Sequence, residues 1–168
     1  IRIQVEGFGL NFADVMAVKG MYREAPPLPS VIGYEVVGRV TECGSAVSKE
    51  MMDQRVVSMT RFGGYAAEVV TDHRAAARIP DSMPIGEAAA LATQGCTAWY
   101  AARILAPVRK GDRVLVHSAA GGVGQLLTQL AVHSGCEVFA GGSGAEKRTY
   151  LQSLGAHHII DRSIGDPH

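Results

Sequence analysis

The chain has 168 residues, 47% of them hydrophobic, and a formal net charge of zero, so it can bury a sizeable core as one large domain or two small ones. Its neutrality, with scattered Lys and Arg, argues against nucleic acid as a main partner, and no apolar run approaches the length of a membrane span. Three widely separated cysteines, Cys43, Cys96 and Cys136, predict neither a disulfide framework nor a metal knuckle. We therefore expect a cytoplasmic protein.

Short strands dominate the predicted first domain, residues 1–84. Alternating or β-branched runs separated by Gly, Pro or Asp predict strands over residues 1–5, 35–41, 55–59, 65–71 and 76–79. One helix interrupts them from Phe12 to Val18, with Asn11 as its N-cap and Gly20 just beyond its end. Many short strands at such spacing are typical of a barrel-like β domain.

Helices and strands alternate in the predicted second domain, residues 85–168. Helical segments are expected over residues 85–91 and 97–105, with a break at Gly95. Strands follow over residues 113–117, 137–140 and 157–161, with helices from Val123 and over residues 145–154. This order predicts the first half of a doubly wound parallel sheet, with the second half absent from the sequence.

A glycine-rich turn follows the first strand of that half sheet. The pattern Ala119-x-Gly121-x-x-Gly124 leads from a buried strand into an amphipathic helix, which is the context of a dinucleotide-binding turn. Backbone N–H groups and the positive helix end favour an anion there, and Gly121 and Gly124 would let phosphate approach. The candidate cofactor-binding residues are Ala120, Gly121, Gly122, Val123 and Gly124. The alternative is an ordinary tight turn between a strand and a helix.

The end of the second strand indicates which nucleotide is bound. NAD-binding sites place an Asp or Glu there, whereas this chain has Gly141-Gly142-Ser143-Gly144. Small residues with nearby cations accept a 2′-phosphate instead, and Ser143, Lys147 and Arg162 are the candidates. NADPH is therefore the expected cofactor. The alternative is that Lys147 and Arg148 are ordinary solvated helix charges.

Several motifs in order resemble one enzyme superfamily. They are Gly9-Leu-Asn-Phe-Ala-Asp14, Gly33-Tyr-Glu-Val-Val-Gly38, Phe62-Gly-Gly-Tyr65 and the turn ending at Gly124. Together they resemble the medium-chain dehydrogenase/reductase superfamily, in its quinone oxidoreductase branch, which includes ζ-crystallin. The resemblance covers essentially the whole chain and implies a GroES-like, β-barrel-type catalytic domain followed by a Rossmann domain. It also implies a fragment, without the first strands of one domain and the second half of the other.

The same resemblance implies that no metal is bound. Zinc-dependent members of the superfamily have Cys at the position of Asn11 and Gly-His-Glu in place of Gly33-Tyr34-Glu35, and catalytic zinc needs three protein ligands. No four-cysteine structural lobe is present either. Without this Lewis acid, the expected reaction is hydride transfer from NADPH to a quinone or an α,β-unsaturated carbonyl compound.

The resemblance also suggests residues near the reacting atoms. Asn11 is similar to an Asn that contacts the nicotinamide region, a role compatible with capping the helix. Tyr22 matches a cleft tyrosine and is the candidate proton donor or oxyanion contact, with packing as the alternative. Thr97 is a candidate cofactor contact, and Cys96 is expected to be buried filling.

Two other functions fit the resemblance. One is an enoyl-reductase domain of a polyketide or fatty-acid synthase, and the other is a non-catalytic NADPH-binding protein of the crystallin or membrane-trafficking type. Half a Rossmann sheet leaves a strand edge unprotected, so we expect the 168-residue chain alone to bind NADPH weakly and to be inactive. Homodimerisation is expected of the full-length protein.

Overall fold

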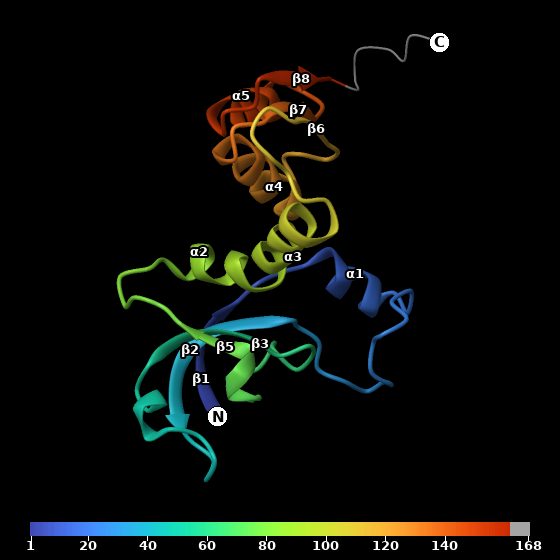
Figure 1. The fold of residues 1–168 in the computed structure, drawn as a ribbon. Helices are drawn as coiled ribbons and strands as arrows, with labels where there is room; N and C mark the ends of the chain where they lie inside the picture. Colours follow the sequence, from blue (N-terminus) through green and yellow to red (C-terminus); the bar gives the residue numbers. More distant parts are fainter. Residues whose placement is uncertain (162–168) are drawn as a thin grey trace. The chain divides into compact units, whose positions relative to one another are not determined.

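The structure is a computed structural model that describes residues 1–161, and the chain divides into two compact units, Ile1–Thr93 and one that begins at Gln94 (Figure 1). The first unit holds a five-stranded antiparallel sheet in the order β4-β1-β2-β3-β5. Its strands are β1 (Arg2–Phe8), β2 (Glu35–Glu42), β3 (Arg55–Met59), β4 (Glu68–Val70) and β5 (Ala76–Arg78). The predicted barrel-type β domain is thus confirmed as a GroES-like antiparallel sheet.

Apolar side chains from the central strands form the core of this sheet. Ile3, Val36, Val40 and Val56 are fully buried and lie in one cluster. Three short helices connect the strands: α1 (Phe12–Val18), η1 (Lys49–Met51) and η2 (His73–Ala75). Helix α1 has the predicted bounds, and Asn11 before it has the extended backbone of an N-cap, with φ −117° and ψ 152°.

Helix α2 (Ile85–Ala90) belongs to the first unit, although the residue pattern changes before it, near Pro84. Ala88, Ala89 and Ala92 pack against Val37 and Val57 of the sheet. The first unit therefore continues to Thr93, nine residues past the boundary that the pattern predicts at residue 84.

Arg55 fixes the segment that leads into α2. Its side chain is 7% exposed, and Nε donates to Glu6 Oε2 at 2.7 Å. One terminal nitrogen also donates to the carbonyls of Pro80, Asp81 and Met83 at 3.1, 3.1 and 2.7 Å. Because this terminal nitrogen carries two N–H bonds, at least one of them is shared between two of the three carbonyls.

The second unit contains a parallel sheet in the order β6-β7-β8 with helices between the strands. Its elements are α3 (Cys96–Tyr100), β6 (Arg113–Val116), α4 (Gly122–His133), β7 (Glu137–Gly141), α5 (Ala145–Ser153) and β8 (His158–Ile160). Val116, Val138, Ala140, Ala131 and Leu151 form its buried core. This arrangement confirms the predicted first half of a Rossmann-like sheet.

The helical region around Gly95 differs from the sequence prediction. Gly95 has helical angles, φ −65° and ψ −48°, so the expected break is absent. Residues Leu91–Gly95 (η3) instead form a π-helical turn that absorbs the irregularity without ending the helix, and a second π-helical turn, Ala101–Leu105 (η4), follows α3 directly. Cys96, expected to be buried, is exposed.

We predict that Arg55→Met lowers the free energy of unfolding by about 3–5 kcal/mol, because it leaves Glu6 and three carbonyls without their buried donor. Arg39→Met is the control, since Arg39 is 43% exposed and pairs with Asp81, which is 75% exposed. Its cost should be about 0–1 kcal/mol. Urea denaturation measures both, and equal costs would contradict the anchoring role of Arg55.

Candidate cofactor and substrate-side sites

The turn between β6 and α4 has the strand–turn–helix geometry of a phosphate-binding turn. Ser118 has a positive φ of 49°, and Gly121 precedes the helix with an extended backbone, φ −81° and ψ 171°. Ala119 is fully buried in the slot where the usual pattern has its first glycine. Its N–H donates to the Gly141 carbonyl at 2.9 Å, which attaches the turn to the end of β7.

The glycines of this turn have different roles. A Cβ on Gly124 would lie 2.3 Å from the Ser118 carbonyl oxygen and 2.8 Å from Ala119 Cα, so Gly124 is needed for helix and turn to pack. A Cβ on Gly121 would meet only the Ser118 carbonyl oxygen, at 3.2 Å. Gly121 is exposed, and so stands where a ligand can approach. Gly124 thus has a packing role that the sequence pattern alone does not distinguish.

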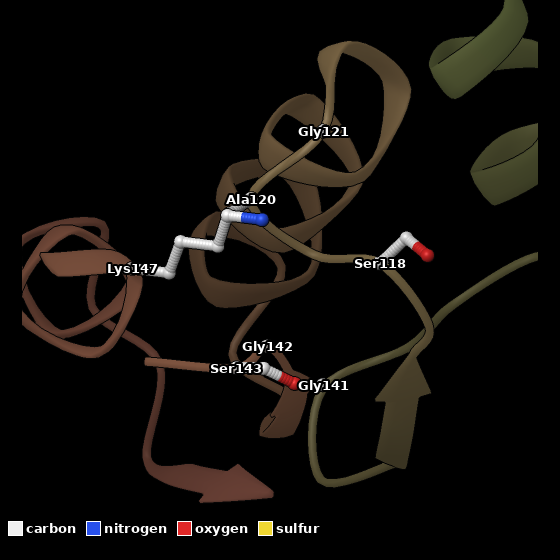
Figure 2. Close-up of a pocket in the computed structure, with 7 residues that line it drawn as sticks. All are labelled: Ser118, Ala120, Gly121, Gly141, Gly142, Ser143 and Lys147. Carbon is white, nitrogen blue, oxygen red and sulfur yellow. The ribbon is translucent and has the colours of Figure 1, made fainter. Parts of the chain in front are cut away.

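A pocket of about 240 Å³ lies at the carboxyl ends of β6 and β7 (Figure 2). Figure 2 shows the Lys147 side chain extending from α5 toward the turn at Ala120. This is the edge of an open α/β sheet where ligands bind. None of the residues that line the pocket is acidic: Ser118, Ala120, Gly121, Gly141, Gly142, Ser143 and Lys147.

Four of the predicted cofactor residues, Ala120, Gly121, Ser143 and Lys147, line this pocket together. Three others, Gly122, Val123 and Gly124, form the first turn of α4, with Gly124 buried. Thr97 lies on α3 with an exposed side chain and does not line the pocket. Arg162 lies outside the described residues.

The two neighbouring cations of α5 differ in their surroundings. Arg148 forms an ion pair with Asp161 at 3.0 Å, beyond the end of β8. Within residues 1–161, no carboxylate pairs with the Lys147 ammonium group. Lys147 is therefore the cation that can serve an anion in the pocket.

A polar cluster in the first unit surrounds Asn11. The Asn11 backbone N–H donates to Asp14 Oδ2 at 2.8 Å, within a capping box at the start of α1. The side-chain nitrogen of Asn11 donates to both carboxylate oxygens of Glu35, at 2.8 and 2.9 Å. The Thr93 hydroxyl donates to Glu35 Oε2 as well.

Glu35 is a buried carboxylate, 1% exposed, at the first position of β2. Burial raises the pKa of this carboxyl group, while the hydrogen bonds from Thr93 and Asn11 oppose that rise. Gly9 makes room for it, because a Cβ there would lie 1.7 Å from Glu35 Oε1. Sequence reasoning used Glu35 only as part of the Gly33-Tyr34-Glu35 motif and missed its contact with Asn11.

Aromatic residues lie beside this cluster. Tyr22 meets Tyr34 edge-on at 6.0 Å between ring centroids, and Tyr34 packs on Phe62 at 5.0 Å. The hydroxyl oxygens of Tyr34 and Tyr65 are buried, and the side chains of Tyr22 and Asp14 lie next to Tyr34 and Tyr65, respectively. Burial raises the pKa of both phenols, so they stay protonated at neutral pH. Tyr22, the predicted proton donor, is half-buried.

Residues 1–161 contain neither a cluster of metal ligands nor a membrane-spanning helix. Within this range, no group of three or more His, Cys, Asp or Glu side chains is arranged to hold a metal ion. Nor does this part of the chain contain a helix with the length and apolar character needed to cross a bilayer.

Known proteins match almost the whole chain. A mycocerosic acid synthase-like polyketide synthase of Mycobacterium tuberculosis is 35% identical over 165 residues, 98% of this chain and 8% of the synthase. The CurK enoyl reductase superposes with a TM-score of 0.87 at 32% identity, over 96% of this chain and 51% of that structure. Quinone oxidoreductase of Escherichia coli, solved with NADPH, has a TM-score of 0.91 at 30% identity, over 99% of this chain and 51% of that one.

The chain thus spans about half of these solved reductases and a small part of the synthase. The family of the alcohol dehydrogenase GroES-like domain matches residues 1–103. With quinone oxidoreductases among its structural neighbours, the chain belongs to this family, within the medium-chain dehydrogenase/reductase superfamily.

Proposed function

We propose that the protein is an NADPH-dependent, zinc-independent reductase that transfers hydride to a quinone or an α,β-unsaturated carbonyl compound. The observation that carries this proposal is the acid-free pocket at the ends of β6 and β7, with Lys147 beside a glycine turn. The NADPH complex of the similar E. coli quinone oxidoreductase supports the choice of cofactor.

The residues of the second unit fit a phosphorylated dinucleotide. The turn residues Ala120 to Gly124 would hold the pyrophosphate at the start of α4, a twelve-residue helix whose positive end favours an anion. The Ser143 hydroxyl would donate a hydrogen bond to the 2′-phosphate, and the Lys147 ammonium group would pair with its charge. Arg162 is proposed as a further cation for that phosphate.

The residues of the first unit would serve the reacting end. When bound, NADPH supplies a hydride to the electron-poor carbon of the substrate. Asn11 would hold the nicotinamide ribose, and Thr97 of the second unit would be a further cofactor contact. The Tyr22 hydroxyl would donate a hydrogen bond to the developing enolate oxygen or a proton to the product, because negative charge accumulates there after hydride transfer.

Zinc independence is supported by the donors around Glu35. The Asn11 amide nitrogen is directed at the carboxylate as a hydrogen-bond donor, and Tyr34 presents a phenol with a raised pKa. Neither offers the thiolate or imidazole electron pair that zinc prefers.

The second candidate is an enoyl-reductase domain of a polyketide synthase. The polyketide synthase relatives and the CurK enoyl reductase favour it. Its substrate would be an α,β-unsaturated acyl thioester, which accepts hydride by the same conjugate addition. For either reductase we propose a cytoplasmic location, which the free cysteines Cys43, Cys96 and Cys136 support, and a homodimer.

The deciding experiment follows NADPH oxidation by the natural full-length protein with a quinone, a simple enone and an enoyl thioester. Turnover of the thioester alone would support an enoyl-reductase domain of a polyketide synthase. Turnover of the quinone or the enone would support the leading proposal, a quinone or enone reductase. Tight NADPH binding without turnover of any of the three would instead indicate a non-catalytic NADPH-binding protein.

Lys147 should determine which cofactor is preferred. Lys147→Ala should weaken NADPH binding about 10- to 100-fold, the value of one charge-assisted hydrogen bond, and leave NADH binding nearly unchanged. Lys49→Ala, an exposed lysine in η1, is the matched control and should leave both affinities unchanged. Fluorescence titration measures the dissociation constants. Equal losses for NADPH and NADH would contradict the role of Lys147.

Tyr22 should act as the proton donor or as the hydrogen-bond donor to the enolate oxygen. Tyr22→Phe should lower kcat about 10²- to 10⁴-fold while NADPH affinity stays the same, because only the donated proton or hydrogen bond is lost. Tyr100→Phe, which removes the hydroxyl of an exposed residue on α3, is the control. Steady-state kinetics with the accepted substrate provides the test, and an unchanged kcat would leave Tyr22 only a packing role.

A further inference from the structure

Glu35 is held in an unusual way for a buried carboxylate. Within residues 1–161 no Lys, Arg or His pairs with it, and its described hydrogen bonds come from the neutral side chains of Asn11 and Thr93. Burying a carboxylate without a cation is costly, so the position needs an explanation beyond packing. The missing side chain at Gly9 creates the space for it.

This contact determines which way the Asn11 amide faces. An ionised carboxylate only accepts hydrogen bonds, so the atom of the Asn11 amide that faces Glu35 must be Nδ2. The carbonyl Oδ1 then faces the backbone N–H of Asp14 in the capping box. The two contacts are complementary, because each would be lost if the amide were rotated by half a turn.

We propose that Glu35 is a positioning residue that presents the Asn11 carbonyl oxygen to a hydroxyl of the nicotinamide ribose. An amide oxygen has two lone pairs, so it can accept from the Asp14 N–H and from a ribose hydroxyl together. Thr93 fixes the carboxylate from the end of the first unit. This inference rests on the proposed function of Asn11 as a cofactor contact.

Exchanging the amide of Asn11 and the carboxylate of Glu35 tests the proposal in the natural full-length protein. In Glu35→Gln, residue 35 has both a donor and an acceptor, so the Asn11 amide can adopt both orientations, and we expect NADPH binding to weaken about threefold to tenfold. In Asn11→Asp, two carboxylates face each other, and the loss should be larger. In the double variant the new amide at position 35 donates to the new carboxylate at position 11, and an oxygen again faces the ribose. Its affinity should return to within about threefold of the wild type.

The readouts are the NADPH dissociation constant and, for each variant, the melting temperature. The proposal is overturned if Glu35→Gln leaves the dissociation constant unchanged, if the double variant binds no better than Asn11→Asp, or if affinity merely follows the loss of melting temperature. If the wild type itself does not bind NADPH, the proposed function fails rather than the role of Glu35.

An independent variant displaces the carboxylate without changing its charge. Gly9→Ala places a methyl group where Glu35 Oε1 lies, so NADPH binding should weaken as in Glu35→Gln. Gly44→Ala is the control, because a Cβ there meets nothing within 4 Å. Unchanged affinity in a folded Gly9→Ala protein would count against the proposal.

Discussion

The hydrogen bonds of Arg55 to the segment before α2 are the constraint on which the first unit depends. Because three carbonyls between Pro80 and Met83 are held on β3, α2 begins next to the sheet and packs its alanines on Val37 and Val57. The residues after α2 then follow the same surface, and Thr93 reaches Glu35. The segment before α2, where the sequence predicts the domain boundary, is therefore part of the support for the polar cluster.

From Glu35 the same chain of contacts continues to the start of α1. The carboxylate orients the side chain of Asn11, and the backbone of Asn11 is in turn fixed by Asp14. A short helix of seven residues has little stability of its own, so these end contacts determine where it begins. Asn11 can cap α1 and still be oriented by Glu35, because the nitrogen of its amide faces Glu35 while the oxygen takes part in the capping box with Asp14.

In the second unit, close packing at Gly124 and one backbone hydrogen bond hold the turn between β6 and α4 in place. Gly124 lets α4 approach the Ser118 carbonyl, and the Ala119 N–H attaches the turn to the end of β7. The residues after β7 are thereby brought next to the turn, so Ser143 and Lys147 line one pocket with Ala120 and Gly121. Residues more than twenty positions apart in sequence meet because adjacent parallel strands end at the same edge.

The sequence predicts the bounds of a helix or strand correctly where neighbouring residues in the chain determine its ends. Helix α1 and strand β3 have the predicted bounds, since capping residues and β-branched runs specify them directly. Strand β1 instead continues to Phe8, because it pairs with β2 across an irregularity between Val5 and Gly7 that no periodicity reveals. The boundary at Thr93 likewise depends on tertiary contacts of α2, and Gly95 remains helical despite its low helix propensity.

Some residues of the candidate site could be predicted from the sequence, and Glu35 could not. That the glycine turn, Ser143 and Lys147 meet could be predicted because adjacent parallel strands end at the same edge, and their binding of a phosphate stays a prediction. The contacts of Glu35 could not be predicted, because its partners Asn11 and Thr93 are 24 and 58 positions away and meet only in the fold. Its motif, Gly33-Tyr34-Glu35, carried a signal that was interpreted only as lost zinc ligands.

The arrangement around Glu35 also explains how a carboxylate can be buried here with no Lys, Arg or His paired to it among residues 1–161. A carboxylate that faced a cation would need few other partners, whereas here an amide nitrogen bridges both oxygens and a hydroxyl adds a further bond. Such neutral donors stabilise a buried charge only if they are held in a fixed geometry, and that requirement rigidifies Asn11 in return. The cost of burying Glu35 is thus linked to the fixed orientation of the side chain that we place against the nicotinamide ribose.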